Sequence, residues 1–307
     1  MSRKQPANLT ASVADRLLLH SKQTGEDHQL VLTRYGLERL MYRLGRSEAA
    51  DQFVVKGALV FLVWRAEPFR MTRDLDLMAT SKPSAEQLLR LFRSLCRLKV
   101  DEDGVEFDEA SVTVTDIRED QQYGGFRVTM RGRLGNIRLP IQVDIGFGDA
   151  MTPEPKSAPF PVLLDAPAPM LRLYSKETVV AEKTEAMVQL GLVNSRMKDY
   201  YDLWVLMKEF EFDGDLLKAA IRATFNRRKT PLPTDVPQGL TDQFGEDPQK
   251  QSQWTAFLRR AHAKNPADNS FKSVIEEIRT FLLPPLLAAG LPDPFYGMWP
   301  KGGPWHS

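Results

Sequence analysis

The chain has few of the residues that build covalent cross-links or histidine-rich metal sites. Its 307 residues include one cysteine, Cys96, and four histidines at the scattered positions 20, 28, 262 and 306. A single cysteine excludes an intramolecular disulfide and a cysteine-rich metal site, which is typical of a protein in a reducing compartment. We therefore expect a cytoplasmic location, with Cys96 as a core residue of a helix and not as a nucleophile.

The sequence also lacks a long apolar run and an excess of charge of one sign. No apolar stretch approaches the ~20 residues of a membrane-spanning helix, and the polar N-terminus has no apolar centre of a signal peptide. Basic and acidic residues number 41 and 40, which gives a net charge of +1. We therefore expect no membrane partner, and any nucleic-acid surface must come from local clustering of basic side chains.

Residues 53–78 carry the strongest chemical pattern in the chain. An apolar run ends at Lys56-Gly57, a second apolar run follows at 58–64, and the stretch closes with Asp74-Leu75-Asp76. Residues two apart in a strand share a face, so the two carboxylates are predicted to lie side by side. They would repel each other unless a cation lies between them, and Mg²⁺ is held by one or two carboxylates plus substrate phosphates. The alternative is a pair of aspartates in a solvated turn.

Three features of the surrounding sequence favour the metal site. Gly57 lies between a predicted strand and a predicted helix, where free backbone N–H groups can meet a phosphate. The segment 141–145 alternates apolar and polar residues and would bring a third carboxylate, Asp144, into the same cleft. A lysine-rich pair of helices follows further along the chain. Arg70 and Arg73 are expected either to contact phosphates or to neutralise the aspartates.

Periodicity predicts the organisation of the remaining chain. Apolar residues at helical spacing predict helices over 9–24, 28–46, 85–98, 175–190, 194–210, 251–264 and 271–288. Alternation predicts strands over 111–118, 125–133 and 136–147, with a turn at Tyr123-Gly124-Gly125. We expect solvated loops at 101–109 and 230–250, a proline-rich connector at 152–170 and a poorly ordered tail at 292–307. This gives four predicted parts, at 1–50, 51–170, 171–290 and 291–307.

Basic residues gather on the predicted hairpin that leads to Asp144. They are Arg127, Arg131, Arg133 and Arg138, and a second basic segment follows at 222–229. These side chains form either a solvated face or part of a channel for an RNA backbone. Asp149 follows the predicted strand that carries Asp144. It would contact the residues of the site without binding the metal or the nucleotide itself.

The helix pair holds a second group of charged residues. Lys183 lies on the first helix, and Arg196, Asp199 and Asp202 recur at every third position of the second. Residues three apart on a helix are neighbours. One interpretation is a surface ladder of salt bridges with a Lys198–Asp202 pair, worth only about 0–1 kcal/mol each.

These motifs together resemble a known family. The pattern K-G-(x)n-R-x-T-x-D-L-D ending at Asp76, followed by I-x-V-D-I-G-F-G-D over 141–149, resembles the AbiEii/AbiGii nucleotidyltransferase toxins. That family includes the MenT toxins and belongs to the DNA polymerase β-like superfamily. The later A-E-K (181–183) and R-x-K-D-x-x-D (196–202) segments are similar as well, and the resemblance covers 53–285. The family usually has Ser or Thr where this chain has Ala58, which removes one hydroxyl and leaves the backbone donors.

The resemblance implies an α+β fold. A polymerase β-like core, a small mixed or antiparallel sheet with helices, would be followed by a helical C-terminal domain that completes the active site. It also implies Mg²⁺-dependent transfer of a nucleotide monophosphate from an NTP to the 3′ end of tRNA, which would inhibit translation. A nearby gene would encode an antitoxin. The alternatives are transfer to a protein hydroxyl or a small molecule, or nucleotide binding without catalysis.

The resemblance further implies roles for individual residues. One or two Mg²⁺ ions would be held by Asp74, Asp76 and Asp144. Lys183 would contact the nucleotide phosphates, and Asp199 and Asp202 would be needed for activity, which we interpret as orienting Lys183 or Arg196. The catalytic residues expected on this basis are Asp74, Asp76, Asp144, Lys183 and Asp202. The expected nucleotide-binding residues are Lys56, Gly57, Ala58, Arg70, Thr72, Lys183, Arg196 and Asp199.

Overall fold

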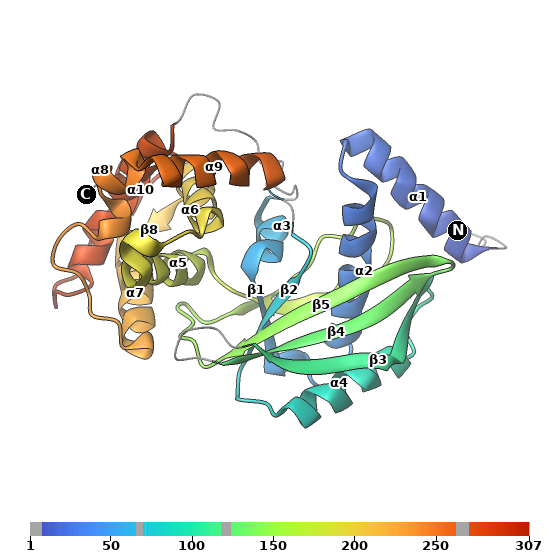
Figure 1. The fold of residues 1–307 in the computed structure, drawn as a ribbon. Helices are drawn as coiled ribbons and strands as arrows, with labels where there is room; N and C mark the ends of the chain where they lie inside the picture. Colours follow the sequence, from blue (N-terminus) through green and yellow to red (C-terminus); the bar gives the residue numbers. More distant parts are fainter. Residues whose placement is uncertain (1–7, 66–69, 71, 118–123, 262–269, 307) are drawn as a thin grey trace. The chain divides into compact units, whose positions relative to one another are not determined.

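The strands that carry Asp76 and Asp144 belong to one seven-stranded sheet in the computed structural model (Figure 1). The strand order is β3-β4-β5-β2-β1-β7-β6. The strands are β1 (Phe53–Lys56), β2 (Leu75–Ala79), β3 (Val105–Ile117), β4 (Gly125–Leu134), β5 (Ile137–Phe147), β6 (Lys156–Pro159) and β7 (Met170–Leu173). The sheet is mixed, because β2 runs parallel to β5 and β1 parallel to β7 while the other neighbours are antiparallel.

The structure describes residues 8–65, 70, 72–117, 124–261 and 270–306. These form two compact units, of which unit 1 is Met1–Gly148 with Lys156–Leu173 and unit 2 is Asp149–Pro155 with Tyr174–Ser307. Three sequence predictions fall partly outside the described residues: Arg118 of a strand, Tyr123 of a turn, and 262–264 of a helix with His262. The four-part division expected from the sequence remains a prediction.

Helices cover one face of the sheet in unit 1. They are α1 (Leu9–Thr24), α2 (His28–Gly45), α3 (Val60–Arg65) and α4 (Ala85–Arg97), with the short three-ten helices η1 (Ala50–Gln52) and η2 (Gly57–Leu59). Helix α4 begins with a capping box formed by Ser84 and Gln87. Helix α2 packs on β5 and β7, and α4 on β3 (Figure 1). Their apolar side chains form a core with Val55, Leu77 and Ile145.

Two loop predictions in unit 1 are wrong. Strand β3 begins at Val105, inside the acidic tract that we expected to be a loop. Val105 and Phe107 are buried while Glu106 faces solvent, so the tract alternates as a strand does. The proline-rich segment is more than a connector, because it contains β6 and the first residue of β7. Strand β6 is the edge strand of the sheet, the position at which a sheet accepts proline.

Unit 2 is helical, as predicted. Its elements are α5 (Lys176–Leu190), η3 (Gly191–Val193), α6 (Met197–Glu209), β8 (Phe212–Asp213), α7 (Gly214–Arg228), η4 (Gln238–Leu240), α8 (Asp242–Glu246), α9 (Pro248–Ala261), α10 (Phe271–Ala288) and β9 (Met298–Trp299). The Ser175 hydroxyl caps α5, and Gly191 ends that helix. The loop expected at 230–250 contains η4 and α8, because Leu240 and Phe244 are buried in the core of the unit.

The C-terminal tail is packed and not poorly ordered. Strand β9 pairs with β8, and Trp299 is buried. The indole nitrogens of Trp299 and Trp305 donate hydrogen bonds to the carbonyls of Met207 and Phe281, at 2.7 and 2.9 Å. A buried indole needs such an acceptor, so the two tryptophans fix the tail against unit 2.

The expected α+β fold, a mixed sheet with helices followed by a helical C-terminal part, is confirmed. In the part of the chain that the structure describes, no helix combines the length and the apolar character needed to cross a membrane.

Candidate functional site

Four charged side chains lie in one row across the sheet of unit 1. Lys56 of β1 is opposite Asp76 of β2, Asp76 is opposite Asp144 of β5, and Asp144 is opposite Arg127 of β4. Residues directly opposite each other project from the same face of a sheet. We call Lys56, Asp76, Asp144 and Arg127 the charged row. Its two central members are carboxylates, and a basic side chain stands at each end.

Gly57 has two reasons to be glycine. Its φ of 70° lies in the left-handed region, which side chains with a Cβ rarely adopt. A Cβ at this position would also lie 2.0 Å from Asp76 Oδ2. The bend after β1 therefore leaves the space that the Asp76 carboxylate occupies. The sequence indicated a glycine for phosphate contact, and the structure adds its contact with the aspartate.

The ammonium group of Lys56 reaches across β2. An ideal Cβ built on Gly146 of β5 would lie 3.5 Å from Lys56 Nζ. Gly146 is two residues beyond Asp144 on the same face of the strand. The lysine therefore brings positive charge to the strand that carries Asp144, over the face that holds both carboxylates.

Asp144 is held by Arg127 through both of its oxygens. Arg127 Nε donates to Oδ1 at 2.8 Å and Nη2 donates to Oδ2 at 2.7 Å, while Gln142 Nε2 lies 3.5 Å from Oδ1. The hydrogen bonds to Asp144 raise the pKa of Arg127, burial lowers it, and the charges of Asp144, Asp74 and Asp76 raise it further, so that the net pKa is above its ordinary value. All three predicted carboxylates thus act on the guanidinium of Arg127, a residue that was not predicted to belong to the site.

The other residues predicted in the 56–76 stretch have different surroundings. Asp74 lies one residue before β2, and the Thr72 hydroxyl donates to its backbone carbonyl at 3.4 Å. Ala58 is buried, so its side chain belongs to the core of the unit. Arg70 is half-buried. Thr72 thus contacts the backbone at Asp74.

The donor set of the charged row suits a hard divalent cation. Carboxylate oxygens are the ligands that Mg²⁺ prefers, and the missing side chain of Gly57 leaves room for the Asp76 carboxylate. Within the described ranges, no three His, Cys, Asp or Glu side chains converge closely enough to hold a metal ion. Both oxygens of Asp144 are engaged by Arg127 instead.

Two of the four hairpin arginines, Arg127 and Arg131, form ion pairs with carboxylates. Arg131 pairs with Asp108 at 2.8 Å, and Arg133 lies opposite Glu106 of β3 in the register. Arg138 is the cross-strand neighbour of Arg133. Of the two interpretations given for these arginines, the pairing favours a solvated, charge-balanced face.

In unit 2, Lys183 of α5 contacts two aspartates of α6. Its ammonium lies 2.6 Å from Asp199 Oδ1 and 2.8 Å from Asp202 Oδ2, and Arg196 Nε lies 2.9 Å from Asp199 Oδ2. We call these four residues the lysine–aspartate cluster. Of the surface ladder that the spacing also allowed, the Arg196–Asp199 pair is present. Asp199 and Asp202 are only 2% and 1% exposed, however, and Asp202 pairs with Lys183 and not with Lys198.

The charge state of Asp199 follows from this cluster. Complete burial pushes the pKa of its carboxyl upward, but the positive charges of Lys183 and Arg196 outweigh burial, and the net pKa is below the ordinary value of 3.8. Asp199 is therefore ionised at neutral pH although it is buried.

A second charged group in unit 2 was not anticipated. Arg228, at the end of α7, lies 2.7 Å from Glu185, 3.1 Å from Asp149 and 3.7 Å from Glu182. Burial lowers the pKa of Arg228, but the charges of Glu182 and Asp149 and the hydrogen bonds to Asp149 and Glu185 raise it above its ordinary value. Glu182 and Glu185 flank Lys183 on α5, so this group fixes the helix that carries the lysine. The basic segment 222–229 was its only signal in the sequence.

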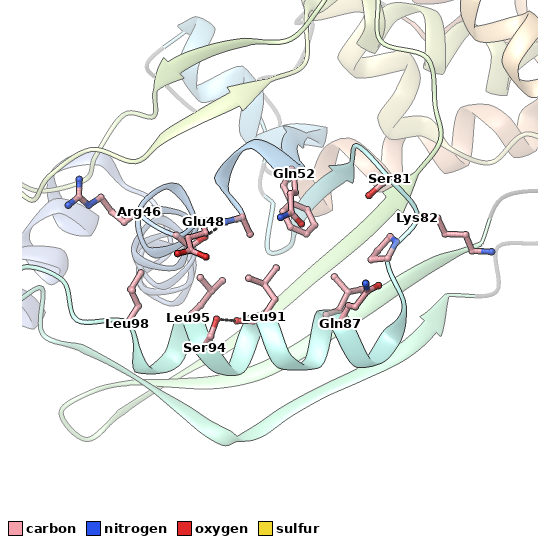
Figure 2. Close-up of a pocket in the computed structure, with 15 residues that line it drawn as sticks. Arg46, Glu48, Gln52, Ser81, Lys82, Gln87, Leu91, Ser94, Leu95 and Leu98 are labelled. Carbon is pink, nitrogen blue, oxygen red and sulfur yellow. Dashed lines mark hydrogen bonds between the residues drawn. The ribbon is translucent and has the colours of Figure 1, made fainter.

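A cavity of about 660 Å³ lies elsewhere in unit 1. Figure 2 shows Leu91 and Leu95 of α4, with Leu98 just after the helix, facing the segment that holds Arg46, Glu48 and Gln52. None of the residues of the charged row lines it. The cavity is therefore separate from the charged row.

Comparison with known proteins identifies the class. A family model described as "Nucleotidyl transferase AbiEii toxin, Type IV TA system" matches residues 39–277, more than half of the chain, which makes the chain a nucleotidyltransferase. It belongs to the AbiEii toxin family of type IV toxin–antitoxin systems. No curated protein matches the chain. Membership implies a nucleotide substrate and an antitoxin partner.

Two solved structures from Helicobacter pylori match the chain. One is a candidate nucleotidyltransferase and the other is JHP933. Each is 16% identical with a TM-score of 0.45 and covers 90% of this chain, and the matches cover 93% and 90% of the respective H. pylori chains.

Proposed function

We propose that this nucleotidyltransferase moves a nucleotide monophosphate from an NTP to the 3′ end of tRNA in a Mg²⁺-dependent reaction, and thereby inhibits translation. An acceptor hydroxyl would attack the α-phosphorus, the bond from that phosphorus to the bridging oxygen would break, and pyrophosphate would leave. The observation that carries the proposal is the register of Asp76 and Asp144, two carboxylates side by side on one face of the sheet.

We assign the metal to the aspartates of unit 1. Asp74, Asp76 and Asp144 would hold one or two Mg²⁺ ions, which when bound would activate the hydroxyl and offset the charge of the triphosphate and the departing pyrophosphate. Gly57 keeps room for Asp76, and the backbone at Gly57 and Ala58 would face a phosphate. Lys56, Arg70 and Thr72 are proposed as further contacts to the nucleotide.

We assign the phosphate contact of unit 2 to Lys183. A lysine is a point charge suited to a triphosphate. Its contacts with Asp199 and Asp202 support an orienting role for both aspartates, and Arg196 is held by Asp199 in the same way. Asp202 is thus proposed as essential because it fixes the position of Lys183.

The acceptor is tested by following the label of the nucleotide. Purified protein is incubated with Mg²⁺, total tRNA and each NTP in turn, labelled either at the α- or at the γ-phosphate. We expect α-label on tRNA from one or two NTPs only, and no transfer of γ-label. The double variant Asp74→Ala/Asp76→Ala should lose transfer, whereas Asp108→Ala, which removes an acid of the same sheet face, should keep it.

The pairing of the hairpin arginines supports a second candidate acceptor. Because Arg131 is neutralised by Asp108, this face offers less free positive charge to an RNA backbone. A protein hydroxyl or a small molecule is therefore the alternative, and α-label on protein would select it. Nucleotide binding without transfer to any acceptor would contradict the catalytic proposal.

A further inference from the structure

The Arg127–Asp144 ion pair occupies a carboxylate that the proposed reaction needs. The guanidinium takes both oxygens of Asp144 in a two-point contact, at 2.8 and 2.7 Å. A divalent cation binds to carboxylate oxygens and needs at least one of them. Arg127 and a cation therefore compete for the same atoms.

The two carboxylates at the centre of the charged row repel each other unless positive charge lies beside them. Asp76 and Asp144 are direct neighbours on parallel strands, and like charges in that position destabilise a sheet. Lys56 on one side and Arg127 on the other offset this repulsion. A divalent cation between the carboxylates would offset it as well, and Arg127 would then be surplus positive charge.

The exposure of the pair makes the exchange possible. The side chains of Arg127 and Asp144 are 42% and 22% exposed, and ion pairs open to solvent contribute little to stability. The pair can therefore open without disturbing the fold. Arg131 and Asp108 form a similar exposed pair four residues along the same strand, but Asp108 has no carboxylate of β2 opposite it.

We propose that Arg127 is the resident counter-ion of Asp144 in the metal-free protein, and that a divalent cation bound at the aspartates of the charged row displaces it. The proposal rests on the proposed function. Its consequence is that Arg127 weakens the binding of the bare cation. The cation then binds best together with the nucleotide, whose phosphates supply additional ligands and negative charge.

The direct test measures Mn²⁺ binding without nucleotide, by the electron paramagnetic resonance signal of free Mn²⁺. Arg127→Met should bind Mn²⁺ about three- to fivefold more tightly than the natural chain, since it removes an exposed competitor. Arg127→Lys should fall between them, because lysine keeps the charge but cannot take both oxygens. Arg131→Met is the matched control and should not change the affinity. In an Asp144→Asn background, Arg127→Met should give no gain.

Several results would overturn the exchange. These are an unchanged or weaker Mn²⁺ affinity in Arg127→Met, an equal gain in Arg131→Met, or Arg127→Lys binding as weakly as the natural chain. Absence of Mn²⁺ binding in every variant would overturn both the exchange and the metal assignment. Failure of nucleotide transfer with the expected order of Mn²⁺ affinities would overturn the proposed reaction alone, so the two proposals fail separately.

A second measurement follows cation binding in the natural chain, without a substitution in the site. The Arg127 Nε–H resonance, assigned by its loss in Arg127→Met, is followed in the natural chain as Mg²⁺ is added. We expect it to shift from the position of a hydrogen-bonded guanidinium toward that of a free one. A resonance that keeps its position at saturating Mg²⁺ would contradict displacement.

Discussion

Two ion-pair groups, one in each unit, use the same residue types under opposite conditions. In the charged row, Arg127 and Asp144 meet at a surface where the arginine is 42% exposed. In the lysine–aspartate cluster, Lys183 is 16% exposed and its partners Asp199 and Asp202 are almost completely buried. An exposed pair is worth about 0–1 kcal/mol, whereas removal of one partner from a buried pair costs about 3–5 kcal/mol.

The difference indicates which contacts can change during function. The charged row can release Asp144 to another cation with little loss of stability, so it suits a site that binds and discharges ligands. The lysine–aspartate cluster holds its ammonium in one place, because separated charges inside the protein would be strongly unfavourable. Unit 1 thus holds an ion pair that can exchange, and unit 2 holds a lysine fixed by its two aspartates.

The largest expected effect compares one substitution in both groups. Asp202→Ala should lower the free energy of unfolding by about 3 kcal/mol, because it leaves the buried Lys183 with one carboxylate fewer. Asp144→Ala should lower it by less than about 1 kcal/mol. Urea denaturation measures both values. Equal losses would break the distinction between the two groups.

The next effect concerns the space that the charged row needs. Gly57→Ala should lower the free energy of unfolding by about 2–3 kcal/mol, because the new Cβ combines left-handed strain with a collision against Asp76. Gly25→Ala is the matched control: Gly25 has a φ of 72° and no atom near its Cβ position. It should lose only about 1–2 kcal/mol. Thermal unfolding and nucleotide transfer are compared, and identical losses would remove Asp76 from the explanation.

A third effect follows from the ionisation of Asp199. Its pKa is lowered in the folded protein, so its contribution to stability is complete above the ordinary value of 3.8 and is lost as pH falls through the lower folded value. Below about pH 4, the natural chain should lose stability more steeply than Asp199→Asn, by at most ~1.4 kcal/mol per pH unit. Urea titrations at several acidic pH values measure the slopes. Parallel slopes would show that Asp199 is not held by the cluster.

The smallest effect separates stability from ligand binding. Arg127→Met and Arg131→Met each remove one arm of an exposed pair, so each should change the free energy of unfolding by less than about 0.5 kcal/mol. Their melting curves should nearly coincide although their Mn²⁺ affinities differ. A large loss in Arg127→Met alone would make its ion pair a structural element of unit 1.

The pairing of Arg127 with Asp144 follows from the turn that joins their two strands. The hairpin of β4 and β5 turns at Gly135, whose φ of 59° suits glycine, and Leu134 pairs with Ile137. Counting seven residues back and seven forward along the ladder reaches Arg127 and Asp144. Arg127 and Asp144 were both recognised in the sequence, but the pairing between them follows only when the register is counted from this turn.

The wrong predictions share one physical cause, which is burial that local sequence does not reveal. The acidic tract at 101–109 and the tail at 292–307 look hydrophilic or irregular in sequence, yet Val105 and Trp299 are buried in the cores of their units. The Arg196-to-Asp202 segment carries the spacing of a surface ladder, but packing encloses its aspartates and brings Lys183 to them. Local spacing states which side chains share a face and not whether that face is covered.

The sequence by itself determined the glycine bend, the strands that carry Asp76 and Asp144, and the helical second half, because these follow from periodicity and turn chemistry over a few residues. Only the tertiary structure decided that β2 and β5 run side by side in parallel and that Asp199 and Asp202 enclose Lys183. The physical reason is distance along the chain. Parallel pairing and burial join segments whose contacts are selected by the whole core, and no local pattern specifies them.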